Sequence, residues 1–351
     1  MIRKGLFVGL LLTGFLAQFC DHSSTEPNGP GEVSKPSVNK IAFNDVQHVL
    51  GEDYALCIMN PDGSDLTKIG PGIECFDPFT WSYDAARIVY GNVTNTSTVS
   101  IDGREALGNY SQINYVTLDN MENVTLDIYG ESPVFSHDHS KIAFELRLER
   151  NQNILLMVYD LITKETNTII NIDASDVYDV YWSDDDKQLY YKKIQAFHPE
   201  EYFCSVGLND NEEQILEVTD TRSGGHESWV DISDFERDES ANSDADSVLL
   251  SYQSPDYKKG FGVNVIIDPT TFRTTLHMFL YDLDKKTEKL ITTDTNLYPG
   301  AISWAPTSEK FVYFIVGKGF IVYDLESDAK STILEVVENI PVYMDISWSP
   351  N

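Results

Sequence analysis

Acidic side chains recur shortly before a repeated aromatic residue, and they are the residues in this chain best suited to chemistry. Asp77, Glu131, Asp179, Glu227 and Asp345 each lie within four positions before such an aromatic, and His226 adjoins Glu227. Carboxylates that converge on one cavity, with each other or with a histidine, could bind a cation or an amine or act as an acid–base pair. Whether these side chains converge on one cavity therefore depends on the strands and loops that carry them.

The high acidic content of the whole chain gives these residues a second interpretation. The 351 residues include 56 acidic and 25 basic ones, a formal net charge of -31. At that frequency about half of all four-residue windows contain a carboxylate by chance, so ordinary solvated charge is the alternative to a binding ring. Metal binding by these carboxylates is left open. A surface this negative repels phosphate backbones, so we expect no nucleic-acid partner.

Sequence signatures of several enzyme and metal classes are absent. The chain has no nucleophile-elbow GxSxG, phosphate-binding GxxxxGK, dinucleotide-binding GxGxxG or HExxH motif, so no cofactor is expected. No Cys/His group has zinc-ligand spacing. The acidic stretch 231–247 lacks the order and central glycine of a calcium loop, which favours a solvated loop.

The elements that position the acidic residues are predicted by a repeat. An aromatic, a turn and a β-rich run recur, and each run begins seven residues after its aromatic. The four complete copies begin at Trp81 (run at Ile88), Phe135 (Ile142), Trp182 (Leu189) and Trp304 (Phe311). Two further copies are incomplete: Trp229 reaches a strand at Val248 only after the acidic stretch, and the copy that begins at Trp348 stops at Asn351.

A second apolar run in each unit ends in a turn signal and predicts a hairpin, as in Met157-Val-Tyr-Asp, Phe279-Leu-Tyr-Asp and Ile321-Val-Tyr-Asp. Each unit thus has about four short strands and no convincing helix. Units of about 40–50 residues with four strands are typical of propeller blades. The large aromatic is expected to pack between blades, and the Ser and Asp to bond the turn backbone.

The motif resembles the Trp-Ser-Pro-Asp-Gly repeat of TolB-like six-bladed β-propellers, over residues 39–351. This resemblance implies an all-β, six-bladed propeller that forms one domain. It implies little about function, because that repeat serves proteins with many roles.

We also expect the C-terminal strand to close the ring. The first repeat, from Lys40, lacks the strand that carries the aromatic, whereas residues 342–350 supply such a strand, with Trp348, and nothing after it. Joining the two ends restores a normal blade and pairs two strand edges.

Residues 1–20 are predicted to be an export signal, with Arg3 and Lys4 before the apolar stretch 6–17. They resemble a bacterial lipoprotein signal in which Cys20 is lipidated, although Gln18 and Phe19 replace the usual small residues. The alternative is a cleaved, secreted protein. Residues 21–38 are predicted to be a disordered tether. If Cys20 is lipidated, Cys57 and Cys75 form the one locally plausible disulfide, with Cys204 left over.

The sequence therefore predicts a non-enzymatic binding scaffold at the cell envelope, monomeric, held to a membrane by a lipid anchor alone, and recognising a protein or a small ligand. The alternative is a carbohydrate-active lyase or hydrolase that uses carboxylates at the channel mouth.

Overall fold

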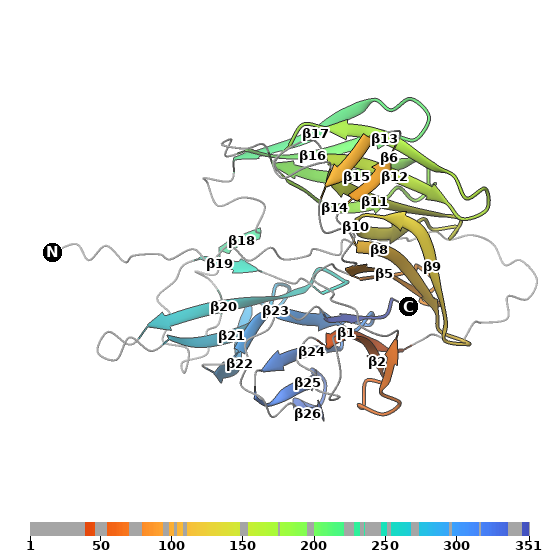
Figure 1. Cartoon of the computed structure of the whole chain (residues 1–351). Coiled ribbons are helices and arrows are strands. Elements are labelled where there is room, and N and C mark those ends of the chain that lie inside the picture. Colours follow the sequence, from red (N-terminus) through yellow and green to blue (C-terminus); the bar gives the residue numbers. More distant parts are fainter. Residues whose placement is uncertain are drawn as a thin grey trace, which may run out of the picture.

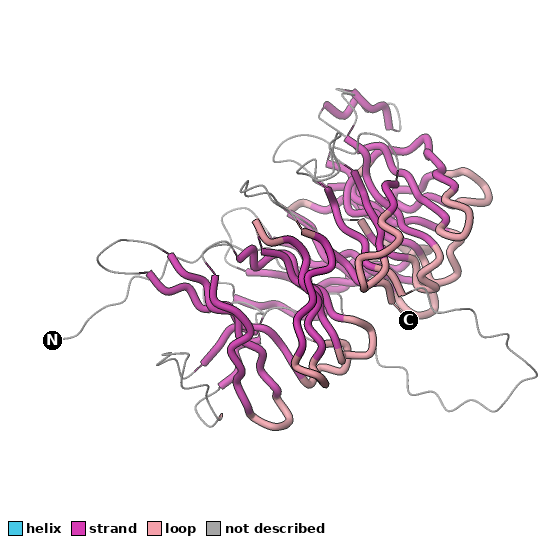
Figure 2. Tube along the Cα trace, turned by 90° about the horizontal axis from the view of Figure 1, so that it is seen from below, coloured by secondary structure: helices cyan, strands magenta, loops and turns pink. Residues whose placement is uncertain are grey.

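The computed structural model describes residues 39–45, 55–69, 79–93, 98–101, 104–107, 111–147, 154–174, 176–194, 200–220, 228–231, 235, 247–250, 254–267, 274–294, 297–315, 317–335 and 346–350. Over these ranges the chain consists of strands and connecting loops, with no helix (Figure 2). The predicted export signal and tether lie outside the described residues.

The described strands form antiparallel sheets that follow one another in chain order (Figure 1). The first has the order β27–β1–β2–β3: Ile346–Trp348, Ile41–Asp45, Ala55–Met59 and Thr67–Ile69. The second is β4–β5–β8–β9: Thr80–Trp81, Arg87–Val93, Ser111–Thr117 and Glu122–Tyr129. The third is β10–β11–β12–β13: Glu131–Phe135, Lys141–Arg147, Ile154–Asp160 and Thr166–Ile172.

The fourth sheet is β14–β15–β16–β17: Asp176–Trp182, Gln188–Ile194, Glu200–Gly207 and Glu213–Asp220. The fifth is β20–β21–β22: Lys259–Ile267, Thr274–Asp282 and Thr287–Asp294. The sixth is β23–β24–β25–β26: Leu297–Trp304, Lys310–Ile315, Gly319–Asp324 and Ala329–Leu334. Two separate hairpins are β6–β7 (Thr98–Ile101, Arg104–Leu107) and β18–β19 (Ser228–Asp231, Ser247–Leu250).

One backbone hydrogen bond recurs in all six sheets, and in five of them it closes a turn that leads into a strand. In the second sheet the amide of Ser82 donates to the carbonyl of Arg87, five residues on, at 2.9 Å. We call this segment the serine turn. The equivalent amide donors in the other sheets are Ser136, Ser183, Ser254, Ala305 and Ser349. Five serine turns, together with the Ser349–Lys40 bond at the corresponding place in the first sheet, agree with the six-bladed propeller class.

Side chains reinforce the serine turn where the sequence predicted it. The hydroxyl of Ser82 donates to Asp84 at 2.7 Å and accepts the amide of Arg87 at 2.9 Å. Ser136 repeats both bonds with Asp138 and Lys141. Ala305 keeps the backbone bond without a hydroxyl, at 2.8 Å, so the backbone geometry and not the serine is the common element.

The fifth serine turn corrects the sequence prediction. The predicted pairing of Trp229 with the strand at Val248 is present, since Trp229 lies opposite Leu249. However, the turn of the fifth sheet begins at Ser254, whose hydroxyl donates to Asp256 at 2.6 Å. The residue before Ser254 is Gln253, so a search anchored on an aromatic passes over this turn. The hairpin β18–β19 precedes the repeat and does not form its turn.

The motif aromatics pack between neighbouring sheets, as predicted. Trp182 is 2% exposed and lies in a core cluster with residues of the third and fourth sheets, where its indole N–H donates to the Val134 carbonyl at 3.2 Å. Equivalent clusters contain Trp81, Phe135, Trp304 and Trp348. Burial of a large aromatic side chain stabilises each of these sheet boundaries.

The third residue after the start of a serine turn has a left-handed backbone although it is not glycine: Ala85, His139, Asp186, Tyr257 and Ser308 have φ between 53° and 59°. In three turns its side chain contacts the preceding turn. Asp186 accepts the amides of His137 and Asp138 at 2.8 and 2.9 Å, His139 lies 3.4 Å from Asp84, and Ser308 accepts the Asp256 amide. These contacts offset the cost of the left-handed backbone.

The predicted hairpins after the second apolar run are present. Asp160 accepts the amides of Ile162 and Thr163 in the turn from β12 to β13, and Asp324 does the same for Glu326 and Ser327 between β25 and β26. The inserted hairpin β6–β7 lies between β5 and β8 and explains the long spacing between Trp81 and Phe135.

Strands from both ends of the sequence share the first sheet. Ile41 pairs with Trp348 and Phe43 with Ile346, while the Ser349 amide donates to the Lys40 carbonyl at 2.9 Å. Trp348 is 5% exposed and packs with residues of the first and sixth sheets.

Deleting residues 343–351 tests whether this pairing closes the ring. Loss of a buried Trp and of the ladder to β1 is expected to lower the free energy of unfolding by about 4 kcal/mol. Urea unfolding followed by tryptophan fluorescence measures the loss. A deletion variant that unfolds in one transition at the wild-type midpoint would show that β27 does not hold the ring.

Candidate functional site

The described acidic candidates lie where the third and fourth sheets meet, at the end of the sheets away from the serine turns. Glu131 begins β10, and Asp179 lies within β14. First strands of neighbouring sheets contact each other, β10 with both β4 and β14. Five further side chains complete what we call the charged network: Arg147, Asp176, Tyr178, Lys192 and Glu201.

Arg147 links the two sheets. It ends β11, and its guanidinium donates to Glu131 at 3.1 Å and to Asp176 at the start of β14. Burial by itself would lower the pKa of Arg147, but the hydrogen bond that Arg147 donates to Asp176 and the charges of Asp176 and Glu131 raise it. Arg147 is therefore fixed as a cation between two carboxylates on different sheets.

Asp179 occupies a bulge in β14. The pairing of β14 with β15 shifts register between Tyr178 and Tyr181, and Asp179 has a left-handed backbone with φ 54°. Ser132 has the same conformation, φ 50°, three residues before the aromatic of the third sheet. A bulge re-aims the side chains beside it. In β14 it brings the carboxylate of Asp179 to Lys192 on β15, at 2.9 Å.

Burial governs the ionisation of this part of the network. The Asp179 and Lys192 side chains are 10% and 18% exposed. Burial raises the pKa of Asp179, with the charge of Lys192 opposing it and the charge of Glu201 adding to it. Burial, together with a hydrogen bond to Glu201 and its charge, also raises the pKa of the Tyr178 hydroxyl, so this group stays a neutral donor.

These contacts are typical of charge pairs and not of an open acid–base centre. Glu131 and Asp179 each carry a basic partner, and Glu201 lies 4.0 Å from Lys192 while accepting from Tyr178. A raised pKa on a buried carboxyl is one property of a general acid. The network can therefore hold two sheets together and, at Asp179, retain a proton to higher pH than an ordinary carboxyl.

Several sequence predictions fall elsewhere. Asp77, His226, Glu227 and Asp345 lie outside the described residues, as do Cys20 and Cys75, so binding by an acidic ring, lipidation and a Cys57–Cys75 disulfide stay predictions. Cys57 and Cys204 are both buried, and burial raises the pKa of the Cys204 thiol to about 11.

Sequence reasoning did not single out Arg147, Asp176, Tyr178, Lys192 or Glu201. Of these five, only Asp176 could have been found from the sequence, because it is a further acidic residue at the start of the strand that carries Trp182. Within the ranges that the structure describes, no group of three or more His, Cys, Asp and Glu side chains is arranged to hold a metal ion. No helix in those ranges is long and apolar enough to cross a membrane.

Comparisons with known proteins support the fold and not an activity. No protein-family model and no curated protein sequence matches the chain. A Bacteroides uniformis protein, provisionally assigned as a 6-phosphogluconolactonase, is similar in structure with TM-score 0.51 and 10% identity, over 88% of this chain and 99% of that one. TolB from Acinetobacter baumannii gives TM-score 0.47 and 16% identity, over 90% and 67%. An oligogalacturonate lyase in complex with manganese gives 0.40 and 12%, over 87% and 76%.

The class that the sheets define is an all-β, six-bladed β-propeller. At these identities the likeness transfers the fold alone.

Replacing Lys192 with Met is expected to leave Asp179 buried and unpaired, at a cost of about 3 kcal/mol near pH 7. The folded-state pKa of Asp179 is already raised above 3.8 and should rise further, so this loss grows as pH increases above about 4. Urea unfolding at pH 4.5 and 7.5 measures it, and adding Asp179→Asn should recover part of it.

Lys187→Met is the matched control, because Lys187 pairs with Asp185 at 2.8 Å but is 70% exposed. Exposed pairs contribute about 0–1 kcal/mol. Equal losses for the two lysine variants would contradict the assignment of a buried pair.

Proposed function

We propose that the protein is a non-enzymatic binding scaffold at the cell envelope, which recognises a protein or a small ligand through the surface of its propeller. The observation that carries the proposal is the engagement of the candidate carboxylates. Arg147 joins Glu131 to Asp176, and Lys192 neutralises Asp179. Groups fixed in this way stabilise a rigid surface, whereas an acid–base pair needs groups directed at a substrate.

The rest of the motif supports the same proposal. Ser82, Ser136 and Ser254 donate to the Asp of their own turn, and these bonds account for the most frequent polar motif of the chain. Location at the envelope rests on the sequence, through Arg3 and Lys4, the apolar stretch 6–17 and Cys20.

The rival function is a carbohydrate-active enzyme, and the raised pKa of Asp179 is the observation that favours it. A buried carboxyl that keeps its proton to higher pH than usual could donate to a glycosidic oxygen, with a second carboxylate as base. This reading requires a substrate to displace Lys192 from Asp179.

The test combines chemical cross-linking in cells with assays of turnover. A binding scaffold is expected to give a discrete cross-linked species that depends on residues 39–351. It is also expected to release no reducing ends and no unsaturated uronates from neutral or acidic polysaccharides. Turnover that Asp179→Asn and Glu131→Gln both abolish, in variants that fold normally, would establish the enzyme instead.

The variant Cys20→Ser tests whether a lipid anchor holds the protein to a membrane. Wild-type protein is expected in the membrane fraction and the variant in the soluble fraction, because one acyl-modified cysteine would be the sole membrane contact. Mass spectrometry of the N-terminal peptide supplies the control. A soluble wild-type protein without an acyl mass would exclude the lipid anchor.

A further inference from the structure

The outermost strand of the fourth sheet exposes apolar side chains. β17 pairs with β16 on one side and, among the described strands, with none on the other. Ile215, Leu216 and Val218 are 53%, 48% and 51% exposed. Figure 1 shows β17, in green, at the outer margin of its sheet. A long apolar edge strand can receive a further strand through its unpaired backbone groups.

The other outermost strands do not share this property. The exposed residues of β9 are Glu122, Asn123, Thr125 and Asp127, all polar. Those of β13 are polar as well, and those of β26 are small, polar or charged, Ala329 to Thr332. β3 has three residues, whereas β17 has eight. The apolar edge is therefore a property of β17 and not of blade edges in general.

Register places these side chains on defined faces. Ile215 lies opposite Cys204 and Val218 opposite Tyr202, on the face that packs toward the third sheet, and Glu217 lies opposite Phe203 on the other face. Leu216 sits at the register shift between them. A strand added to β17 would thus meet apolar side chains on one face and a carboxylate on the other.

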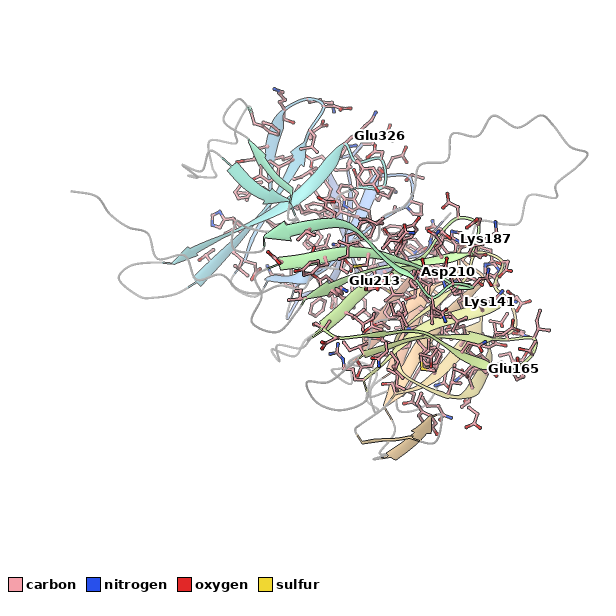
Figure 3. The ribbon with its side chains drawn as sticks, turned by 90° about the horizontal axis from the view of Figure 1, so that it is seen from above. Lys141, Glu165, Lys187, Asp210, Glu213 and Glu326 are labelled. Carbon is pink, nitrogen blue, oxygen red and sulfur yellow. The ribbon has the colours of Figure 1, made fainter. Side chains whose placement is uncertain are left out.

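Charge selects the kind of strand that can pair there. Residues 208–220 contain five acidic residues, Asp210, Glu212, Glu213, Glu217 and Asp220, and no basic one. Asp210 lies in the turn that leads into β17, and Glu213 begins the strand (Figure 3). Lys193 holds Glu213 at 2.6 Å, which fixes the start of the strand. A second copy of this chain, with a net charge of -31, would bring like charges together.

We infer that β17 is a docking edge for an extended segment of a partner protein in which apolar residues alternate with Lys or Arg. The apolar residues of that segment lie beside Ile215 and Val218, and its basic residues are attracted by the net negative charge of residues 208–220. This inference rests on the proposed binding function and names its surface and its class of partner.

The experiment uses the full chain and a fluorescein-labelled peptide of twelve residues that alternates Lys and Val. Fluorescence anisotropy measures the dissociation constant, and hydrogen exchange measures protection of the β17 amides. Ile215→Thr/Val218→Thr is expected to weaken binding at least tenfold while keeping strand propensity and charge. Ile162→Thr is the matched control, because Ile162 is 79% exposed in the turn between β12 and β13, and it should leave the dissociation constant unchanged.

Two further peptides separate the contributions. Alternating Glu and Val keeps the apolar face and reverses the charge, and alternating Lys and Ser keeps the charge without the apolar face. Both should bind at least tenfold more weakly than Lys–Val. The docking edge would be overturned if the Lys–Ser and Lys–Val peptides bound equally well, or if the double Thr variant and the wild type had equal affinity. Exchange protection outside residues 213–220 would overturn it as well.

Sedimentation and cross-linking distinguish the remaining outcomes. A wild-type dimer that the double Thr variant dissociates would identify a second copy as the occupant and overturn the basic partner. A cellular cross-link that persists in the double Thr variant would refute β17 as the surface while leaving the binding function intact. A cellular cross-link lost in that variant but kept in Ile162→Thr would support both.

Discussion

The fold depends on a turn that is closed by a backbone hydrogen bond between residues five positions apart. In the second, third, fourth and sixth sheets, as between Ser136 and Lys141 at 3.0 Å, it returns the chain from the first strand of a sheet into the second. That reversal places the preceding aromatic against the neighbouring sheet, where Trp182 and its counterparts are buried. Sheet boundaries, hairpins and the charged network all take their positions from this repeated reversal.

Polar side chains then couple one turn to the next. Asp186 accepts two amides of the preceding turn, and Arg147 joins carboxylates of two sheets at the opposite end. The third and fourth sheets are thus connected at both ends of their strands and through the core between them. Each sheet derives its stability from its neighbours, as in other repeat architectures.

Sequence patterns predicted the elements well because the turn is local. A Ser, an Asp two residues later and a run seven residues after an aromatic lie within one short window, as at Trp81 and Phe135. The fifth turn was missed because Gln253 replaces the aromatic. The charged network could not be predicted in full, because Arg147 and Asp176 come from different sheets and the burial of Asp179 depends on a bulge. The residue type does not reveal the bulge either, because the equivalent left-handed position in the third sheet is a serine, Ser132.

The shared first sheet also has a mechanical consequence. Asn39 accepts from the Trp348 indole at 2.6 Å, directly before β1, and β1 is flanked by β27 and β2. Tension that reaches the domain from the residues before Asn39 would run along the axis of β1. Ladder bonds on both sides lie across that axis, so they would be loaded in shear and would have to break together. A pull from this end would therefore meet its greatest resistance at the point where the two ends of the sequence pair.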